Sequence, residues 1–211
     1  MLSHYYTVKG QGDHEIVIQK SRFISHIARA TTEAEAQSFI LEIKKKHWDA
    51  THNCSAYIIG EHNQIQKAND DGEPSGTAGV PILEVLKKRD LKDTVVVITR
   101  YFGGIKLGAG GLIRAYGKAT SEGINATGMV ERKLVQIMHT NVEYTLLGKL
   151  ENELRSSSLF LLKNIHYLEA VTFDVYVEED KIESYQAWIT EMTNGKAETT
   201  SGDRLYLEQD V

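Results

Sequence analysis

The chain has 211 residues, enough for one large domain or two small ones, and its composition of 41% hydrophobic and 25% charged residues is typical of a globular protein. The net charge of −5 excludes a generally basic nucleic-acid-binding surface, so any phosphate site must be local. No apolar run approaches the roughly 18–20 residues of a membrane span, and the single cysteine excludes an intrachain disulfide. We therefore expect a cytoplasmic protein that contacts no membrane.

Alternating side chains at the start of the chain predict a β-hairpin. Polar and apolar residues alternate over 4–8, the sequence Gly-Gln-Gly-Asp follows at 10–13, and apolar residues resume at Ile16 and Ile18. We expect the second strand of this hairpin to continue as far as Ile27.

Thr32 and Glu35 mark the first helix start, because they have the spacing of a capping box. The helix is expected to end at the three lysines of residues 44–46, since basic side chains interact favourably with the carboxyl end of a helix. Strands are predicted next, over 55–59 and 64–67.

Turn-forming residues over 69–76 predict a loop before the second helix. That helix is expected to begin between Thr77 and Pro81, and the proline favours the later start because it is tolerated in a first turn. A strand and a further helix follow, over 94–100 and 112–126.

The apolar pattern resets near Thr127 and Gly128, which indicates a second domain. It predicts, in order, a strand over 135–144, a helix over 146–154, strands over 165–167 and 171–177, a helix over 182–192 and a strand over 197–207. The order βαββαβ is typical of a ferredoxin-like fold. We therefore predict an α+β protein of two domains, residues 1–130 and 131–211.

The glycine-rich segment, residues 100–114, is the most informative part of the sequence. It reads Arg-Tyr-Phe-Gly-Gly-Ile-Lys-Leu-Gly-Ala-Gly-Gly-Leu-Ile-Arg and contains no carboxylate. Glycines let the backbone approach a ligand closely, and the free N–H groups of a helix start attract anions. The segment therefore predicts a phosphate site, whose candidate residues are Arg100, Gly103, Gly104, Lys106, Gly108, Gly110, Gly111, Arg114 and Lys118.

The two standard nucleotide motifs do not fit this segment. The nearest Walker A candidate has five residues rather than four before Gly117 and Lys118, and Ala119 stands where a magnesium-binding hydroxyl is required. A dinucleotide fingerprint fails because Ile113 occupies the third glycine position. The alternative to an anion site is a purely structural role for the glycines, in a tight turn with close packing.

The acidic turn, residues 70–73, contains three carboxylates: Asp70, Asp71 and Glu73. They could hold a hard metal ion, shape the turn through the backbone, or pair with Lys106 or Arg114. The EF-hand spacing is absent and no nearby histidine completes a transition-metal set. We therefore expect neither a metal nor a cofactor.

Cys54 and His52 fall on one face of a strand, an arrangement that permits a Cys–His nucleophile. A lone cysteine is more often a buried apolar side chain, and no Gly-x-Ser-x-Gly elbow is present. The residues therefore favour a binding protein over an enzyme, and the sequence names no catalytic residue.

Residues 79–108 resemble the signature of the IMPACT/YigZ family, long catalogued as uncharacterised. The resemblance extends over essentially the whole chain, and its second half is similar to the small domain of the bacterial members. The matching residues are Gly79, Val80, Pro81, Ile82, Leu83, Leu86, Leu91, Val97, Ile98, Arg100, Tyr101, Phe102, Gly103, Gly104, Leu107 and Gly108.

This resemblance implies a ribosomal-protein-type βαβ fold with a left-handed crossover for the N-terminal domain, as in elongation factor G and GHMP kinases, an exception to the usual hand. It implies a C-terminal domain similar to the last domain of elongation factor G. Eukaryotic relatives restrain a translation-regulating kinase by competing for its activator. This sequence does not contain their additional N-terminal domain, so we do not transfer that role.

Three hypotheses for function follow. The first is a cytosolic protein of translation that binds RNA or the ribosome, with phosphates on the backbone of 108–112 and bases stacked on aromatic side chains. The second is an enzyme acting on a small phosphorylated substrate, by analogy with GHMP kinases. The third is an adaptor that binds a protein partner and in which the glycine-rich segment is structural. The candidate stacking residues are Tyr101, Phe102 and Tyr116.

Overall fold

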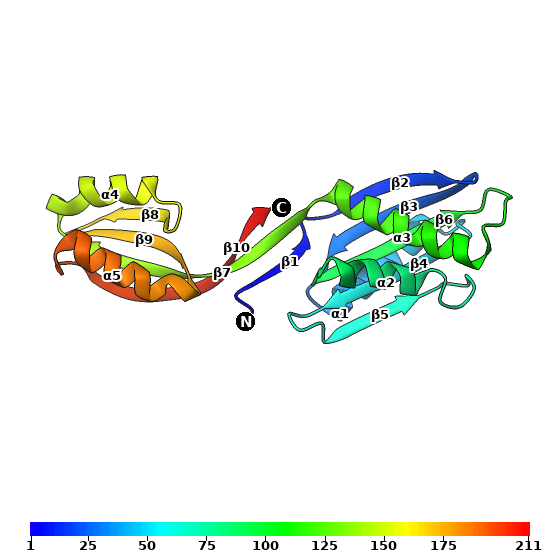
Figure 1. Ribbon diagram of the computed structural model, residues 1–211, viewed down its shortest axis with the longest axis horizontal. Coiled ribbons are helices and arrows are strands. Elements are labelled where there is room, and N and C mark those ends of the chain that lie inside the picture. Colours follow the sequence, from blue (N-terminus) through cyan, green and yellow to red (C-terminus); the bar gives the residue numbers. More distant parts are fainter. The chain divides into compact units, whose positions relative to one another are not determined.

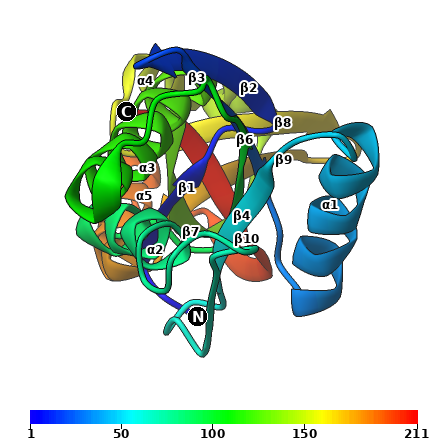
Figure 2. The same cartoon turned by 90° about the vertical axis from the view of Figure 1, so that its right-hand side faces the viewer.

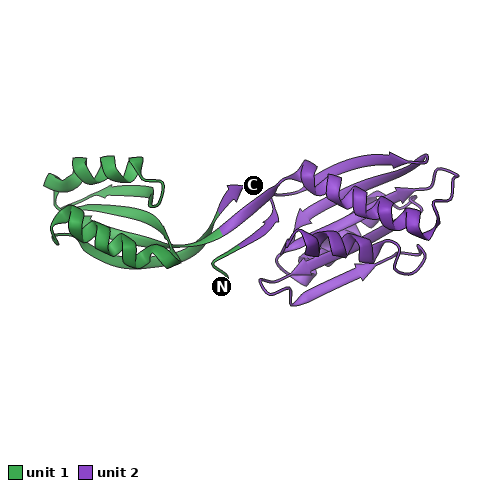
Figure 3. Ribbon diagram, viewed as in Figure 1, with its two compact units in different colours: residues 1–4, 133–207 green, residues 5–132, 208–211 purple.

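The structure, a computed structural model, describes residues 1–211 and divides into two compact units. The N-terminal unit consists of Tyr5–Arg132 with Glu208–Val211, and the C-terminal unit of Lys133–Leu207 with Met1–His4 (Figure 3). Each unit combines helices with strands, so the expected α+β fold of two domains is confirmed. None of the helices is long and apolar enough to cross a membrane.

The N-terminal unit is built on a five-stranded sheet whose neighbouring strands all run antiparallel (Figure 1). Both β3 and β4 are antiparallel to β6, which lies between them, so they run parallel to each other. The connection between them, through α1 (Glu33–Lys46), therefore crosses over one strand. The strand order is β2 (Gly12–Ile18), β3 (Ser21–Arg29), β6 (Thr94–Tyr101), β4 (His52–Ile59) and β5 (Ile65–Asn69).

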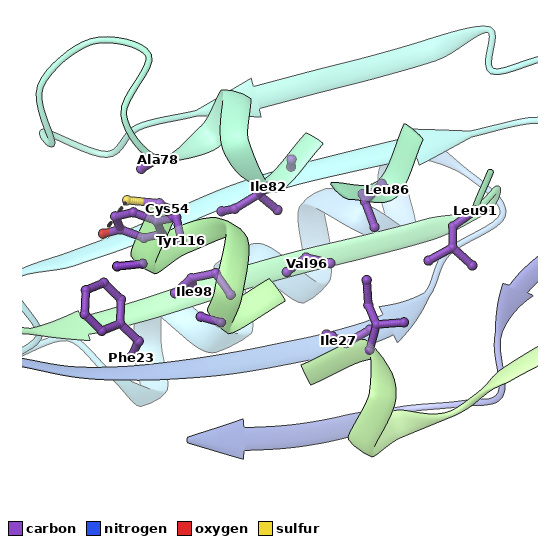
Figure 4. Close-up of a cluster of buried hydrophobic side chains, with 14 of the residues drawn as sticks. Phe23, Ile27, Cys54, Ala78, Ile82, Leu86, Leu91, Val96, Ile98 and Tyr116 are labelled. Atoms are coloured by element: carbon purple, nitrogen blue, oxygen red, sulfur yellow. Dashed lines mark hydrogen bonds between the residues drawn. The ribbon is translucent and has the colours of Figure 1, made fainter. Parts of the chain in front are cut away.

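Helices cover both faces of this sheet (Figure 2). On one face α1 packs against Val95 and Val97 of β6. On the other, α2 (Gly79–Lys88) and α3 (Gly108–Thr127) pack against Val96 and Ile98 of the same strand (Figure 4). Because β6 is buried on both faces, it reads as a continuous apolar run.

The predicted first hairpin is wrong. The strand β1 (His4–Val8) pairs with β7 (Met129–Val142), and β2 pairs with β3 instead. The β2–β3 turn consists of Gln19 and Lys20, both with positive φ (45° and 65°). Turns of this kind usually contain Asn or Gly, so the sequence carried no turn signal and two strands were predicted as one.

Helix starts were predicted with mixed success. The capping box of α1 is present, with Thr32 Oγ1 accepting the N–H of Glu35 at 3.2 Å. The start of α2, at Gly79, lies within the predicted range but before the favoured Pro81. The start of α3 lies four residues earlier than predicted, at Gly108, so the last glycines of the segment belong to its first turn.

The C-terminal unit has the predicted βαββαβ order. Its sheet runs β10–β7–β9–β8, the strand order of a ferredoxin-like fold, and β1 also pairs with β7. Both helices pack on one apolar core with the strands. The elements after β7 are α4 (Leu147–Ser156), β8 (Leu161–Tyr167), β9 (Val171–Glu178), α5 (Ile182–Thr193) and β10 (Glu198–Asp210).

Candidate functional site

A cleft of about 440 Å³ opens beside the first turn of α3 in the N-terminal unit. Residues from the acidic turn, from β4 and β6 and from the glycine-rich segment line it together, although they are distant in sequence. The lining residues are Thr51, His52, Glu73, Pro74, Arg100, Phe102, Lys106, Leu107, Gly108, Ala109 and Leu112. The cleft therefore brings together Arg100, Lys106 and Gly108 of the predicted phosphate site. The other predicted residues lie outside its lining, namely Gly103, Gly104, Gly110, Gly111, Arg114 and Lys118.

The first turn of α3 has no side-chain cap. Leu107 occupies the cap position, and the turn contains no acidic residue. The first N–H groups of a helix have no partner within the helix and carry the positive end of its dipole. The cleft therefore contains hydrogen-bond donors that suit an anion.

Two exposed basic side chains near this turn have no ion pair. Lys106 lines the cleft, and Nη1 of Arg114 lies 3.4 Å from the position that a Cβ on Gly110 would occupy. The third predicted cation, Lys118, pairs with Glu122 at 3.6 Å on the exposed surface of α3. Exposed pairs of this kind are weak, so Lys118 can exchange its partner at little cost.

Arg100 forms a buried ion pair on the floor of the cleft. Its Nη1 donates to Glu73 Oε1 at 2.6 Å, and both side chains are at least 94% buried. Its Nη2 lies 3.4 Å from Ser21 Oγ, and its Nε is buried without a hydrogen bond. The primary partner of Arg100 in this structure is therefore a carboxylate of the protein.

Tyr116 cannot stack on a base, because it is completely buried and its hydroxyl donates to Glu73 Oε1 at 2.8 Å. Burial raises its pKa, so the hydroxyl keeps its proton. Cys54 Sγ lies 3.3 Å from the same hydroxyl, and burial raises the pKa of this thiol to about 12. A buried thiol that stays protonated is a poor nucleophile, which argues against the Cys–His alternative.

The other two aromatic candidates differ in exposure. Phe102 is 46% exposed and lines the cleft, with the Arg100 guanidinium 5.5 Å from its ring centre. Tyr101 is half-buried, and its hydroxyl donates to Asp49 at 3.2 Å. Phe102 is therefore the aromatic side chain best placed to meet a ligand in the cleft.

The first two glycines shape the turn after β6. A Cβ on Gly103 would collide with the carbonyl group of Lys20, so this position admits only glycine. Gly104 and Gly108 have φ of 84° and 69°, a region that favours glycine. Gly111 packs beside Leu107. Part of the glycine pattern thus has a structural cause, as the alternative interpretation requires.

The carboxylates of the acidic turn pair with neither Lys106 nor Arg114. Asp70 accepts three backbone N–H groups, from Gly76 at 2.8 Å, Ala78 at 3.0 Å and Gly79 at 2.8 Å, so it caps the start of α2. Burial opposes ionisation, but these donors outweigh it and lower the pKa of Asp70.

Asp71 is engaged in the same way. It accepts from Lys44 Nζ at 2.6 Å and from the backbone N–H of Asn53 at 2.7 Å. These donors outweigh burial and lower the pKa of its carboxyl group. No group of three His, Cys, Asp or Glu side chains in the structure could hold a metal ion.

Sequence reasoning missed one neighbour in the cleft, His52 beside Glu73. Its Nδ1 lies 2.8 Å from the carbonyl oxygen of Asp71, and its Nε2 lies 3.8 Å from Glu73 Oε2. The two residues are 21 positions apart, and only the fold of the acidic turn against β4 brings them together. No local sequence signal could have shown this.

Two family models match the chain, the Impact N-terminal domain over residues 19–124 and a domain of unknown function, DUF1949, over residues 140–196. The IMPACT family member YvyE of Bacillus subtilis is 67% identical over 211 residues, which cover 100% of this chain and 97% of that protein. The chain belongs to the IMPACT family. The predicted family is therefore confirmed.

Other IMPACT proteins are more distant. The family member YigZ of Escherichia coli is 32% identical, over 84% of this chain and 88% of its own length. A protein IMPACT homolog of Dictyostelium discoideum is 41% identical, over 43% of this chain and 27% of that protein. A solved crystal structure of a hypothetical protein is 27% identical with a TM-score of 0.61, over 96% of this chain and 99% of that one.

Proposed function

We propose that this IMPACT protein is a non-enzymatic cytosolic factor of translation that binds RNA, free or in the ribosome, through the cleft beside α3. The start of α3 carries the proposal, because its N–H groups have no cap and the adjacent Lys106 and Arg114 have no ion pair. The combination of free helix N–H groups with unpaired cations suits a phosphate.

Each part of the cleft has a role in this proposal. A phosphate lies on the backbone N–H groups of residues 108–110, and Lys106 and Arg114 contribute charge. A base stacks on the exposed ring of Phe102. Such contacts hold the backbone without reading the sequence. The net charge of −5 is consistent with a small footprint on RNA.

The structure gives little support to a kinase-like reaction at this site. Such a reaction needs a carboxylate that can hold magnesium or accept a proton. Asp70 caps α2, Asp71 pairs with Lys44, and Glu73 pairs with Arg100. Both oxygens of Asp70 and of Asp71 are engaged by the protein, so either residue would have to leave a partner before it could act on a substrate, and only Glu73 Oε2 has no hydrogen bond.

The test is binding of a fluorescent single-stranded RNA to wild type and to Lys106→Ala/Arg114→Ala, measured by anisotropy over a range of salt concentrations. The double variant should bind more weakly at low salt. The slope of log K against log salt should become shallower by about 0.7 for each phosphate that the variant no longer neutralises.

Lys88→Ala is the matched control. Lys88 is exposed in the last turn of α2, and the following Arg89 bonds Asn125 in the second half of α3, away from its first turn. This variant should bind like wild type, and all variants should have the same melting temperature within error. Equal, salt-insensitive binding by wild type and the double variant would refute RNA binding in this cleft and favour the protein-adaptor hypothesis.

A further inference from the structure

Two side-chain atoms without a hydrogen bond face each other in the cleft, at the distance of a long ion pair. Glu73 Oε1 accepts from Arg100 and Tyr116, whereas Glu73 Oε2 has no hydrogen bond. Nε2 of His52, 3.8 Å away, has none either. The Glu73 side chain is 97% buried, but Oε2 is not fully enclosed, so a group in the cleft can reach it.

The hydrogen bonding of His52 leaves one ring nitrogen for a ligand. The carbonyl oxygen of Asp71 can only accept, so Nδ1 of His52 must carry the proton of that bond. When Nε2 also carries a proton, as an ion pair with Glu73 requires, it is a donor beside the carboxylate acceptor. Since 3.8 Å is less than twice the length of a hydrogen bond, one hydroxyl group can accept from Nε2 and donate to Glu73 Oε2.

We propose that Glu73 and His52 recognise the 2′-hydroxyl of a ribose, and that the cleft thereby selects RNA over DNA. This inference rests on the proposed binding of RNA phosphates at the start of α3. Both residues line the same cleft as Lys106 and Phe102. A ribonucleotide has a phosphate for the helix start, a ring for Phe102 and a hydroxyl group that can donate to Glu73 and accept from His52. Deoxyribose has no hydroxyl group at this position.

The first experiment changes the ligand and leaves the protein intact. Wild type is titrated at constant salt with fluorescent cytidine dodecamers made of RNA, DNA or 2′-O-methyl RNA. RNA should bind about tenfold more tightly than DNA, the effect of one hydrogen bond to a charged acceptor. The 2′-O-methyl strand, which has lost the hydroxyl proton, should bind like DNA.

Two variants locate the effect. His52→Ala should reduce the preference for RNA, because one of the two partners of the hydroxyl group is removed while the Glu73–Arg100 pair is retained. Lys106→Ala should weaken binding of all three strands by the same factor, because a phosphate contact does not distinguish the sugars. Unchanged melting temperatures show that both variants fold.

The outcomes separate this inference from the proposed function. Salt-dependent binding of RNA and DNA with equal affinity would overturn ribose recognition and leave phosphate binding intact, as would 2′-O-methyl RNA that binds as tightly as RNA. No binding of any strand would overturn both. Free cytidine monophosphate could also be added as a competitor. If it competed as strongly as the RNA strand at the same concentration of nucleotides, the site would bind a single nucleotide rather than a strand.

Discussion

The acidic turn and the glycine-rich segment border the same cleft but treat their charges in opposite ways. Each carboxylate of the turn has a partner inside the protein, namely the start of α2, Lys44 or Arg100. In the glycine-rich segment, apart from the buried Arg100, the cations have no ion pair and the helix start has no cap. The turn therefore holds the fold together and leaves only Glu73 Oε2 without a hydrogen bond, whereas the segment retains cations and helix N–H groups that can bind a ligand.

This difference shows why charged residues in a sequence do not by themselves identify a binding site. Clusters of charge look equally functional in a sequence, and only the fold shows which of them are already neutralised. Changes to the carboxylates of the acidic turn, or to their partners Lys44 and Arg100, should therefore alter stability, and changes to the rest of the glycine-rich segment should alter binding more than stability. Three predictions test this contrast.

The largest effect on stability is expected for Arg100→Met. Removing the guanidinium leaves the buried Glu73 carboxylate without its ion pair, which should lower the free energy of unfolding by about 3–5 kcal/mol. Urea unfolding measures the change. The double variant Arg100→Met/Glu73→Leu should recover much of the loss, since an apolar pair can replace a buried ion pair. A single variant as stable as wild type would show that the pair does not hold the cleft floor.

A smaller effect is expected in acid. Asp70 and Asp71 have lowered pKa values in the folded protein, so their stabilisation is complete above the unfolded-state value of about 3.9. It is lost as the pH falls through the folded values. In urea unfolding below about pH 5, Asp70→Asn/Asp71→Asn should show a shallower pH dependence than wild type and lower stability at neutral pH. Parallel pH profiles would contradict this role.

The smallest effect is expected for Gly110→Ala, in the first turn of α3. A Cβ at this position would meet only the mobile end of Arg114, so the variant should gain up to about 1 kcal/mol from helix propensity. Gly108→Ala is the matched control and should lose stability, because φ of Gly108 is 69°. Thermal unfolding distinguishes the two, and a gain in both variants would contradict the geometry of this turn.

Much of the fold could be predicted because its signals are local. The pair Thr32 and Glu35 marked the start of α1, and apolar spacing gave the complete βαββαβ order of the C-terminal unit. The β2–β3 turn escaped prediction because Gln19 and Lys20 are not typical turn residues. Helices and strands are predicted correctly where the spacing of apolar and capping residues follows their geometry. Their prediction fails where tertiary packing imposes an unusual backbone conformation.

The site was less predictable, because its contacts join distant positions. The sequence suggested that the carboxylates of the acidic turn could pair with Lys106 or Arg114. Glu73 pairs with Arg100 instead, because β6 and the acidic turn lie side by side. Asp70 caps a helix that begins nine residues later, far outside the spacing of ordinary caps. Tyr116 was a candidate for stacking because the sequence alone does not show that the packing of α3 buries its ring.

The interleaved ends of the chain have a consequence for attempts to separate its parts. The polypeptide passes between the two units three times, after His4, after Arg132 and after Leu207. One proteolytic cut between Arg132 and Lys133 therefore leaves two covalent tethers. A fragment that stops before Glu208 also loses the carboxylate that Arg29 and Arg132 contact at 2.5 Å and 3.3 Å. Dissection of this protein into halves must keep both short terminal pieces.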